Sequence, residues 1–233
     1  VLTETTGIIT AAQIDNLGTT GLGGRLWGFS SNGDWLIYTG EDNRPKVLDL
    51  VNGTTVELKL KGAPFNPGFP KDQERIAIAS TSGEIEIYDV KSGDLVKAIP
   101  AAPPGTHILP IFSPDDSEIF AAGMDKTESE VAMFDAGSGH ALWKATYPGG
   151  IADAAFSSTG DRAYVSGEAG MKVYDAGKGD DITARYDFPK LALGAMAISS
   201  ADRRIVAELE DTELIVMDGE SGRELLRLDR DTP

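Results

Sequence analysis

The 233-residue chain contains no cysteine. This absence excludes a disulfide framework, a zinc–thiolate site, an iron–sulfur cluster and a thiol nucleophile. A cysteine-free chain of this length fits an exported bacterial protein, and we expect a periplasmic or secreted location rather than a cytoplasmic one. The chain begins at Val1 rather than at Met, which indicates a removed leader or a domain of a longer protein.

Basic residues are scarce as well. Acidic residues outnumber lysine and arginine by 37 to 21, which gives a formal net charge of −16 at pH 7. Nucleic-acid binding needs a basic surface, so this charge argues against a nucleic-acid partner. It also disfavours anionic membrane surfaces. Apolar runs are far shorter than the roughly 20 residues that span a bilayer, so we expect no membrane insertion.

Motifs for catalysis and cofactor binding are few. The chain has two histidines, His107 and His140, and no nucleophile-elbow pattern accompanies them. The glycine-rich stretch 18–24 lacks the Lys-Ser/Thr pair of a phosphate-binding loop. No spacing matches an EF-hand, but carboxylates are abundant, so a divalent cation such as Ca²⁺ stays open as a ligand. We predict no other cofactor.

Helical periodicity is nearly absent, apart from a short stretch at 10–16, and the chain instead repeats itself. Two sequence anchors recur five times, each at intervals of 40 to 46 residues. The first is an apolar residue followed by Asp and a glycine-containing turn, at Leu48-Asp49, Tyr88-Asp89, Phe134-Asp135, Tyr174-Asp175 and Met217-Asp218. The second begins Phe29-Ser30-Ser31, Phe69-Pro70-Lys71, Phe112-Ser113-Pro114 and Phe156-Ser157-Ser158, with a degenerate copy at Ile198-Ser199-Ser200.

Each repeat reads as a set of short strands. In the second repeat, apolar and polar residues alternate over 75–79 and 84–89, and a further apolar run covers 95–99. Turns at Ser82-Gly83 and Ser92-Gly93 separate these runs. Alternation with period two, broken by Gly and Ser, is the signature of antiparallel strands. Four such strands in about 40 to 45 residues predict a β-propeller blade.

These motifs resemble the WD-repeat family and its YVTN-type bacterial relatives over residues 25–229. The stretch from Phe112 to Asp115 looks like the family's turn between the two inner strands, and 163–166 echoes the YVTN strand. Tyr88-Asp89, Phe134-Asp135 and Tyr174-Asp175 stand where the family places Trp-Asp. The chain departs from eukaryotic WD repeats in lacking the Gly-His pair and that Trp. The resemblance therefore implies packing through aliphatic and Tyr contacts instead of the usual His–Asp network.

The predicted fold is an all-β propeller of four-stranded antiparallel blades, with five repeats visible. Two readings stay open, a closed five-bladed ring and a part of a larger propeller. Residues 1–24 are predicted to form a lead-in or a closing strand, and 25–233 the propeller. We expect Phe29, Phe69, Phe112 and Phe156 in the core, and blades near 25–61, 62–102, 103–148, 149–190 and 191–229.

Candidate site residues follow from the usual ligand-binding face of propellers. That face is built from the loops entering each inner strand and from the turns between second and third strands. The second set includes 41–44, 80–82, 125–127, Glu168 and 210–211. Arg25 and His107 are among the few non-acidic polar groups of the entry loops, and they suggest an anionic or peptide-carboxylate partner. We expect five entry-loop residues to converge near the axis and bind a partner: Arg25, Phe65, Asn66, His107 and Asp153.

The predicted function is a non-catalytic binding or interaction module that presents loops to a protein, peptide or small molecule. A protein or peptide is the expected partner, and the oligomeric state is not predicted. The alternative is a propeller enzyme of the hydrolase or lactonase type. That enzyme would use the channel-facing carboxylates Asp153, Glu168, Glu210 and Asp211, with or without a divalent cation.

Overall fold

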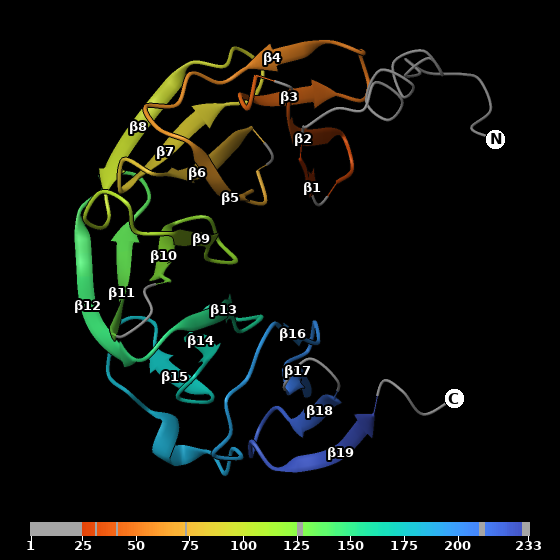
Figure 1. Cartoon of the computed structure of the whole chain (residues 1–233), viewed down its shortest axis with the longest axis vertical. Coiled ribbons are helices and arrows are strands. Elements are labelled where there is room, and N and C mark those ends of the chain that lie inside the picture. The colour runs from red at the N-terminus through yellow and green to blue at the C-terminus, as the bar shows by residue number, and fades with distance from the viewer. Residues whose placement is uncertain are drawn as a thin grey trace, which may run out of the picture. The chain divides into compact units, whose positions relative to one another are not determined.

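The computed structural model describes residues 25–30, 32–40, 42–72, 74–124, 128–209 and 213–229 (Figure 1). The predicted lead-in and the short helical stretch at 10–16 lie outside these residues. The described chain forms five antiparallel sheets, four with four strands and one with three. In each sheet the strands follow one another in chain order. No helix among the described residues is long and apolar enough to cross a membrane.

The chain divides into two compact units, one ending at Gly105 and one beginning at Thr106. Repeats one and two form the first unit, and repeats three to five form the second. The first unit contains β1 (Leu26–Phe29), β2 (Trp35–Thr39), β3 (Pro45–Asp49), β4 (Thr55–Glu57), β5 (Pro64–Gly68), β6 (Arg75–Ser80), β7 (Glu84–Asp89) and β8 (Leu95–Pro100). The second contains β9 (Ile108–Phe112), β10 (Glu118–Gly123), β11 (Glu128–Asp135), β12 (Ala141–Pro148), β13 (Ile151–Phe156), β14 (Arg162–Gly167), β15 (Lys172–Asp175), a 3₁₀ turn (Thr183–Arg185), β16 (Met196–Ile198), β17 (Arg204–Leu209), β18 (Glu213–Asp218) and β19 (Glu224–Asp229).

The first sequence anchor forms the turn that follows the third strand of a repeat, as predicted. In repeat two, Asp89 Oδ1 accepts hydrogen bonds from the backbone N–H groups of Lys91 and Ser92, at 3.1 and 2.8 Å. Gly93 then takes a positive φ of 73°, which glycine adopts without steric cost. Aspartate thus replaces backbone partners that the turn cannot supply. Asp49, Asp175 and Asp218 accept equivalent bonds.

The second anchor closes the hairpin between the two inner strands. Ser113 Oγ accepts a hydrogen bond from the backbone N–H of Glu118 at 3.0 Å and donates to Asp115 Oδ1 at 2.7 Å. Hydrogen bonds from the Ser117 and Ser113 hydroxyls hold the pKa of Asp115 at about 2. Ser157 repeats this arrangement with the N–H of Arg162 and the carboxylate of Asp161. A serine after the aromatic residue is therefore a structural part of the repeat.

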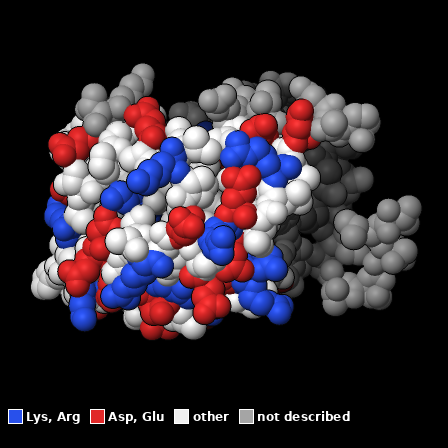
Figure 2. All heavy atoms as spheres, turned by 90° about the horizontal axis from the view of Figure 1, so that it is seen from below, with Lys and Arg blue, Asp and Glu red and all other residues white. Residues whose placement is uncertain are grey.

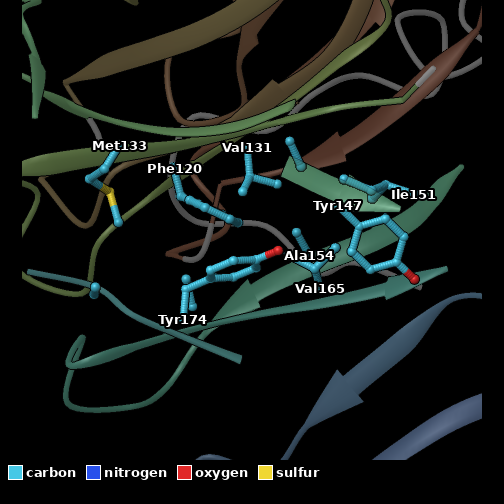
Figure 3. Packing of buried hydrophobic residues seen from close by; sticks show 11 residues of the cluster. Phe120, Val131, Met133, Tyr147, Ile151, Ala154, Val165 and Tyr174 are labelled. Atoms are coloured by element: carbon cyan, nitrogen blue, oxygen red, sulfur yellow. The ribbon is translucent and has the colours of Figure 1, made fainter. Parts of the chain in front are cut away.

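Tyrosine and aliphatic side chains join neighbouring repeats, as the missing His–Asp network implied. Tyr88, in the Tyr-Asp position, is buried and its hydroxyl reaches Lys59 O of the preceding repeat at 2.9 Å. Tyr174 reaches Thr146 O in the same way, at 3.3 Å. Figure 3 shows Phe120 packing toward Tyr174 in the core between repeats three and four. This prediction is confirmed.

The four anchor phenylalanines do not share one environment. Phe112 is buried, and Phe69 and Phe156 pack at the edges of cores with the preceding repeat. Phe29 is 60% exposed, so its predicted core position is wrong. Phe69 and Phe156 each face the sheet before their own, and no described sheet precedes repeat one. Burial at this position depends on a neighbour that the local motif does not encode.

Repeat four also departs from the predicted four strands. Its sheet ends at β15, and Tyr174 and Asp181 form only an isolated bridge. Thr183 Oγ1 accepts the Val173 N–H at 2.9 Å, where a fourth strand would offer a carbonyl. Ile182 turns into the core with repeat five. Tertiary packing thus overrides the strand pattern, and the segment from Asp180 to Leu193 takes an irregular path instead.

Candidate functional site

The five predicted site residues occupy two kinds of position. Arg25 and His107 directly precede β1 and β9, as expected of entry loops. Phe65 and Asn66 lie inside β5, and Asp153 lies inside β13, so their assignment to loops is wrong. The inner strands begin earlier than predicted, because pairing already starts at Pro64 opposite Ser80 and at Ile151 opposite Gly167.

Convergence of these residues at one axis remains a prediction. Arg25, Phe65 and Asn66 belong to the first unit, whereas His107 and Asp153 belong to the second. Within the first unit, the Arg25 guanidinium lies over the Trp27 ring at 4.3 Å from its centroid. This cation–π contact orients the charge while leaving the residue exposed. The binding role of the five residues stays a prediction.

Asp153 has a structural task in the second unit. Its Oδ2 accepts a hydrogen bond from the backbone N–H of Met196 at 2.9 Å, and its Oδ1 one from Ala154 at 2.8 Å. The first of these bonds ties the inner strand of repeat five to that of repeat four. A carboxylate held by two backbone donors is poorly placed for proton transfer, so the geometry favours a scaffold role over catalysis.

The two histidines lie at opposite ends of the sheet of repeat three, which contains β9 to β12. His107 precedes Ile108, which pairs with Gly123 at one end of β10. His140 follows the turn after Asp135, which pairs with Glu118 at the other end. Both side chains are exposed. This register places the two histidines too far apart to bind one ligand together.

A cleft of about 340 Å³ opens on the second unit at the ends where β13 and β16 begin. We call these strand ends, together with the turn between β14 and β15, the entry face of repeats four and five. Both predicted classes of loop contribute to it, the entry loops and a turn between second and third strands. The cleft is lined by Gly150, Ile151, Ala152, Gly167, Glu168, Ala192, Leu193, Gly194 and Glu208.

Glycines allow the walls of this cleft to approach one another. A Cβ on Gly167 would come within 2.2 Å of the Gly150 carbonyl oxygen, and one on Gly194 within 3.1 Å of Glu208 Cβ. Backbone hydrogen bonds fix the same walls. Glu168 N–H donates to Gly150 O at 3.0 Å, and Gly194 N–H donates to Glu208 O at 2.8 Å. The cleft is therefore a built feature with little freedom to collapse.

Two carboxylates give the cleft its chemistry. Glu168 is exposed, and its Oε2 accepts a hydrogen bond from the Gly150 N–H at 3.1 Å. Glu208 is half-buried at the end of β17. The sequence analysis placed Glu168 on this face but did not single out Glu208. The lining holds two acidic groups and no basic one, so it favours a cationic group.

Charges elsewhere are mixed. Figure 2 shows acidic and basic side chains interleaved over the face in view. In repeat five, Arg227 pairs with Glu224 at 2.9 Å and Arg204 with Asp218 at 3.2 Å. Such exposed pairs contribute little to stability, but they neutralise the surface locally. The cleft stands out because its two carboxylates share one cavity without a basic side chain in its lining.

A metal centre is not indicated by the residues that the structure describes. Among them, no three His, Asp or Glu side chains come together as ligands would. The acidic positions 125, 210 and 211, named above as candidates, lie outside the described residues, as does Glu41. The Ca²⁺ ligand considered from the sequence therefore stays a prediction.

Comparison with known proteins settles the fold. The chain is similar to the β-propeller domain of Cps50 (Swd1) from Myceliophteria thermophila, with a TM-score of 0.71. The chain has the β-propeller fold. The match covers 89% of this chain and 74% of that domain, at 12% sequence identity, so it carries the fold alone. No family model and no curated protein sequence matches the chain.

Proposed function

We propose that this propeller is a WD-repeat-like interaction module that binds a protein partner through the entry face of repeats four and five. The observation that carries the proposal is the acidic cleft between those repeats. Loops of both predicted classes build it, and hydrogen-bonded backbone fixes its walls. Protein recognition needs such pre-formed loop surfaces on a rigid scaffold.

The lining supports binding over catalysis. It offers two carboxylates, glycine backbone and three kinds of apolar side chain, and its described members include no histidine, serine or lysine. Two of the carboxylates that the hydrolase alternative invoked are engaged by backbone N–H groups: Asp153 by those of Met196 and Ala154, and Glu168, which lines the cleft, by that of Gly150. These features give no geometric support to the hydrolase or lactonase alternative.

The cleft also favours a cationic partner group over the carboxylate suggested by Arg25 and His107. A lysine or arginine side chain that enters it meets Glu168 and Glu208 and forms charge-assisted hydrogen bonds. The surrounding charge of −16 raises the encounter rate of a basic protein. We therefore propose a partner that presents a basic side chain to this face.

A photo-crosslinking experiment tests the proposal. A benzophenone amino acid replaces Ala152, an exposed residue that lines the cleft on the entry face, and in a control it replaces Glu220, in the turn between β18 and β19. We expect a protein partner to crosslink at position 152 and not at 220. Equal capture at both positions, or capture at 220 alone, would contradict the proposed face. Hydrolysis of a lactone and ester panel by the wild-type chain, lost in Glu208→Gln, would favour the enzyme instead.

We further propose that another blade covers the outer face of repeat five. Tyr164 and Val173 of repeat four are fully buried against repeat five. The corresponding residues of repeat five, Val206 and Val216, are only half-buried in the described chain. The Cps50 domain extends beyond the matched part, which supports a further sheet. Repeat one would supply it in a closed five-bladed ring, and another repeat would supply it in a larger propeller.

A further inference from the structure

We infer that the entry face of repeats four and five binds an extended peptide that carries a basic residue next to a bulky apolar one. The inference deepens the proposed function and rests on it. Its basis is a second cavity, of about 440 Å³, that adjoins the acidic cleft. Glu168 and Ala192 line both cavities. The two cavities are therefore neighbours, and we call them together the groove, acidic at one end and mainly apolar at the other.

The second cavity exists because repeat four lacks its outermost strand. The chain leaves β15 after the bridge at Asp181 and continues through the 3₁₀ turn and Pro189 toward repeat five. A groove stays open between this irregular segment and the start of β15. Its apolar lining comes from Met171, Ala184, Tyr186, Phe188, Pro189 and Leu191.

The apolar end has a rigid aromatic wall. Tyr186 and Phe188 stack with ring centroids 5.0 Å apart and planes inclined by 15°. Gly222 of repeat five lies against both rings, since a Cβ there would come within 2.9 Å of Tyr186 Cβ and of Phe188 Cδ1. The Asp187 N–H donates to Ser221 O at 2.7 Å and anchors the segment. A fixed wall lowers the entropic cost of binding an apolar side chain.

Charge distinguishes the two ends of the groove. Two lysines, Lys172 and Lys190, line the apolar end, and Lys172 pairs with Asp181 at 2.6 Å. Their positive charge disfavours a basic side chain at that end. Glu168 forms no ion pair with any residue that the structure describes. A basic side chain is therefore attracted to the Glu168–Glu208 end, while the Tyr186–Phe188 end takes an apolar group. Because the ends share Glu168 and Ala192, the two partner residues are close neighbours along an extended chain.

The test begins with a displayed library of random decapeptides selected on the immobilised wild-type chain. We expect enrichment of Lys or Arg within a few positions of an aromatic or branched aliphatic residue. Enrichment of acidic peptides, of purely apolar peptides, or of none would overturn the inference. The crosslinking experiment is independent of this selection, so a partner captured at position 152 without peptide enrichment refutes the inference and leaves the proposed function standing.

Variants then assign the two ends of the groove. The best selected peptide is titrated against Glu208→Gln and Leu191→Ser, with Glu220→Gln and Leu225→Ser as matched controls outside the groove. Leu191 and Leu225 are 38% and 51% exposed, so neither substitution opens a buried core. We expect about ten-fold weaker binding for Glu208→Gln and about five-fold for Leu191→Ser. Controls that weaken binding as much as the groove variants would overturn the assignment.

Discussion

Replacing Tyr88 with Phe removes a hydroxyl from a buried polar network in the first unit. That hydroxyl donates to Glu86 Oε2 at 2.7 Å, with Lys59 O 2.9 Å away. Glu86 is fully buried, and its other oxygen accepts hydrogen bonds from the Lys61 N–H at 3.1 Å and the Ser80 hydroxyl at 3.3 Å. Without the Tyr88 hydroxyl, Glu86 Oε2 loses its hydrogen-bond donor in a buried site.

The expected cost follows from the charge of the acceptor. A hydrogen bond to a charged group contributes about 1.5–3 kcal/mol, against roughly 0.5–1.5 kcal/mol for a neutral pair. Tyr174→Phe provides the matched control, because Tyr174 stands in the same motif position but reaches only the Thr146 carbonyl, at 3.3 Å. We expect a loss of about 2 kcal/mol for Tyr88→Phe and less than about 1 kcal/mol for Tyr174→Phe.

Urea denaturation followed by circular dichroism and tryptophan fluorescence measures both losses. A double-mutant cycle with Glu86→Gln then isolates the coupling between Tyr88 and Glu86, which we expect to be about 1 kcal/mol or more. If Tyr88→Phe costs no more than Tyr174→Phe, or if the cycle shows no coupling, the reasoning about this network is refuted.

The same network gives a pH dependence. Burial, followed by the neighbouring Glu86, raises the pKa of Tyr88 above its ordinary value. The unfolded chain ionises its tyrosines near pH 10, while the folded chain keeps Tyr88 neutral. Its contribution to stability is therefore complete below about pH 10 and is lost as the pH rises further. Tyr88→Phe should show a shallower alkaline loss of stability than the wild type.

Three further predictions concern the second unit. Burial alone would raise the pKa of Asp161, but hydrogen bonds from Thr159 and Ser157 hold it at about 2, so the ionised side chain stabilises the fold above about pH 4 and loses this effect as the pH falls toward 2. Asp161→Asn should therefore make the free energy of unfolding depend less on pH over that range, by less than about 1 kcal/mol because the side chain is exposed. Urea denaturation at several pH values measures this, and an unchanged pH dependence would refute it. Asp153→Ala leaves the Met196 N–H without its acceptor, so amide exchange in β16 should accelerate at least ten-fold, with unaltered exchange as the contrary result. Because the chain has no native cysteine, Val216→Cys gives a single label site, and it should react at least ten-fold more slowly than Leu225→Cys if a further blade covers repeat five.

Local chemistry made much of the fold predictable. An Asp before a glycine-containing turn, and a Ser after an aromatic residue, each satisfy backbone groups within a few residues. Asp89 and Ser113 form these bonds as the repeat pattern indicated. Since the information lies in the turn itself, the turns and the antiparallel pairing of the strands that they join follow from the sequence.

Features that depend on a neighbouring sheet could not be predicted in this way. Phe29 carries the same motif as Phe112 but stays exposed, because no described sheet lies before repeat one. Ile182 and Thr183 fall where a fourth strand was predicted, yet core packing of Ile182 and a side-chain hydrogen bond of Thr183 replace regular strand pairing with β15. The repeat pattern of the sequence therefore predicts neither the exposure of Phe29 nor the loss of the fourth strand in repeat four.

The candidate site was predictable only in part for the same reason. Glu168 sits in a short turn between the second and third strands, a position that the propeller pattern marks directly. Glu208 joins it only because Gly194 lets the segment before β16 approach the end of β17. Two repeats meet there, and a reading of one repeat at a time treats Glu208 as an ordinary strand residue.

The central claim is that the entry face of repeats four and five binds the partner. Hydrogen exchange of the wild-type chain, with and without the best selected peptide, tests it most directly. We predict protection in 150–152, 167–169 and 191–194, and none in the opposite turns at 136–139 and 177–180. Protection confined to those opposite turns, or spread equally over both ends of the sheets, would contradict the claim.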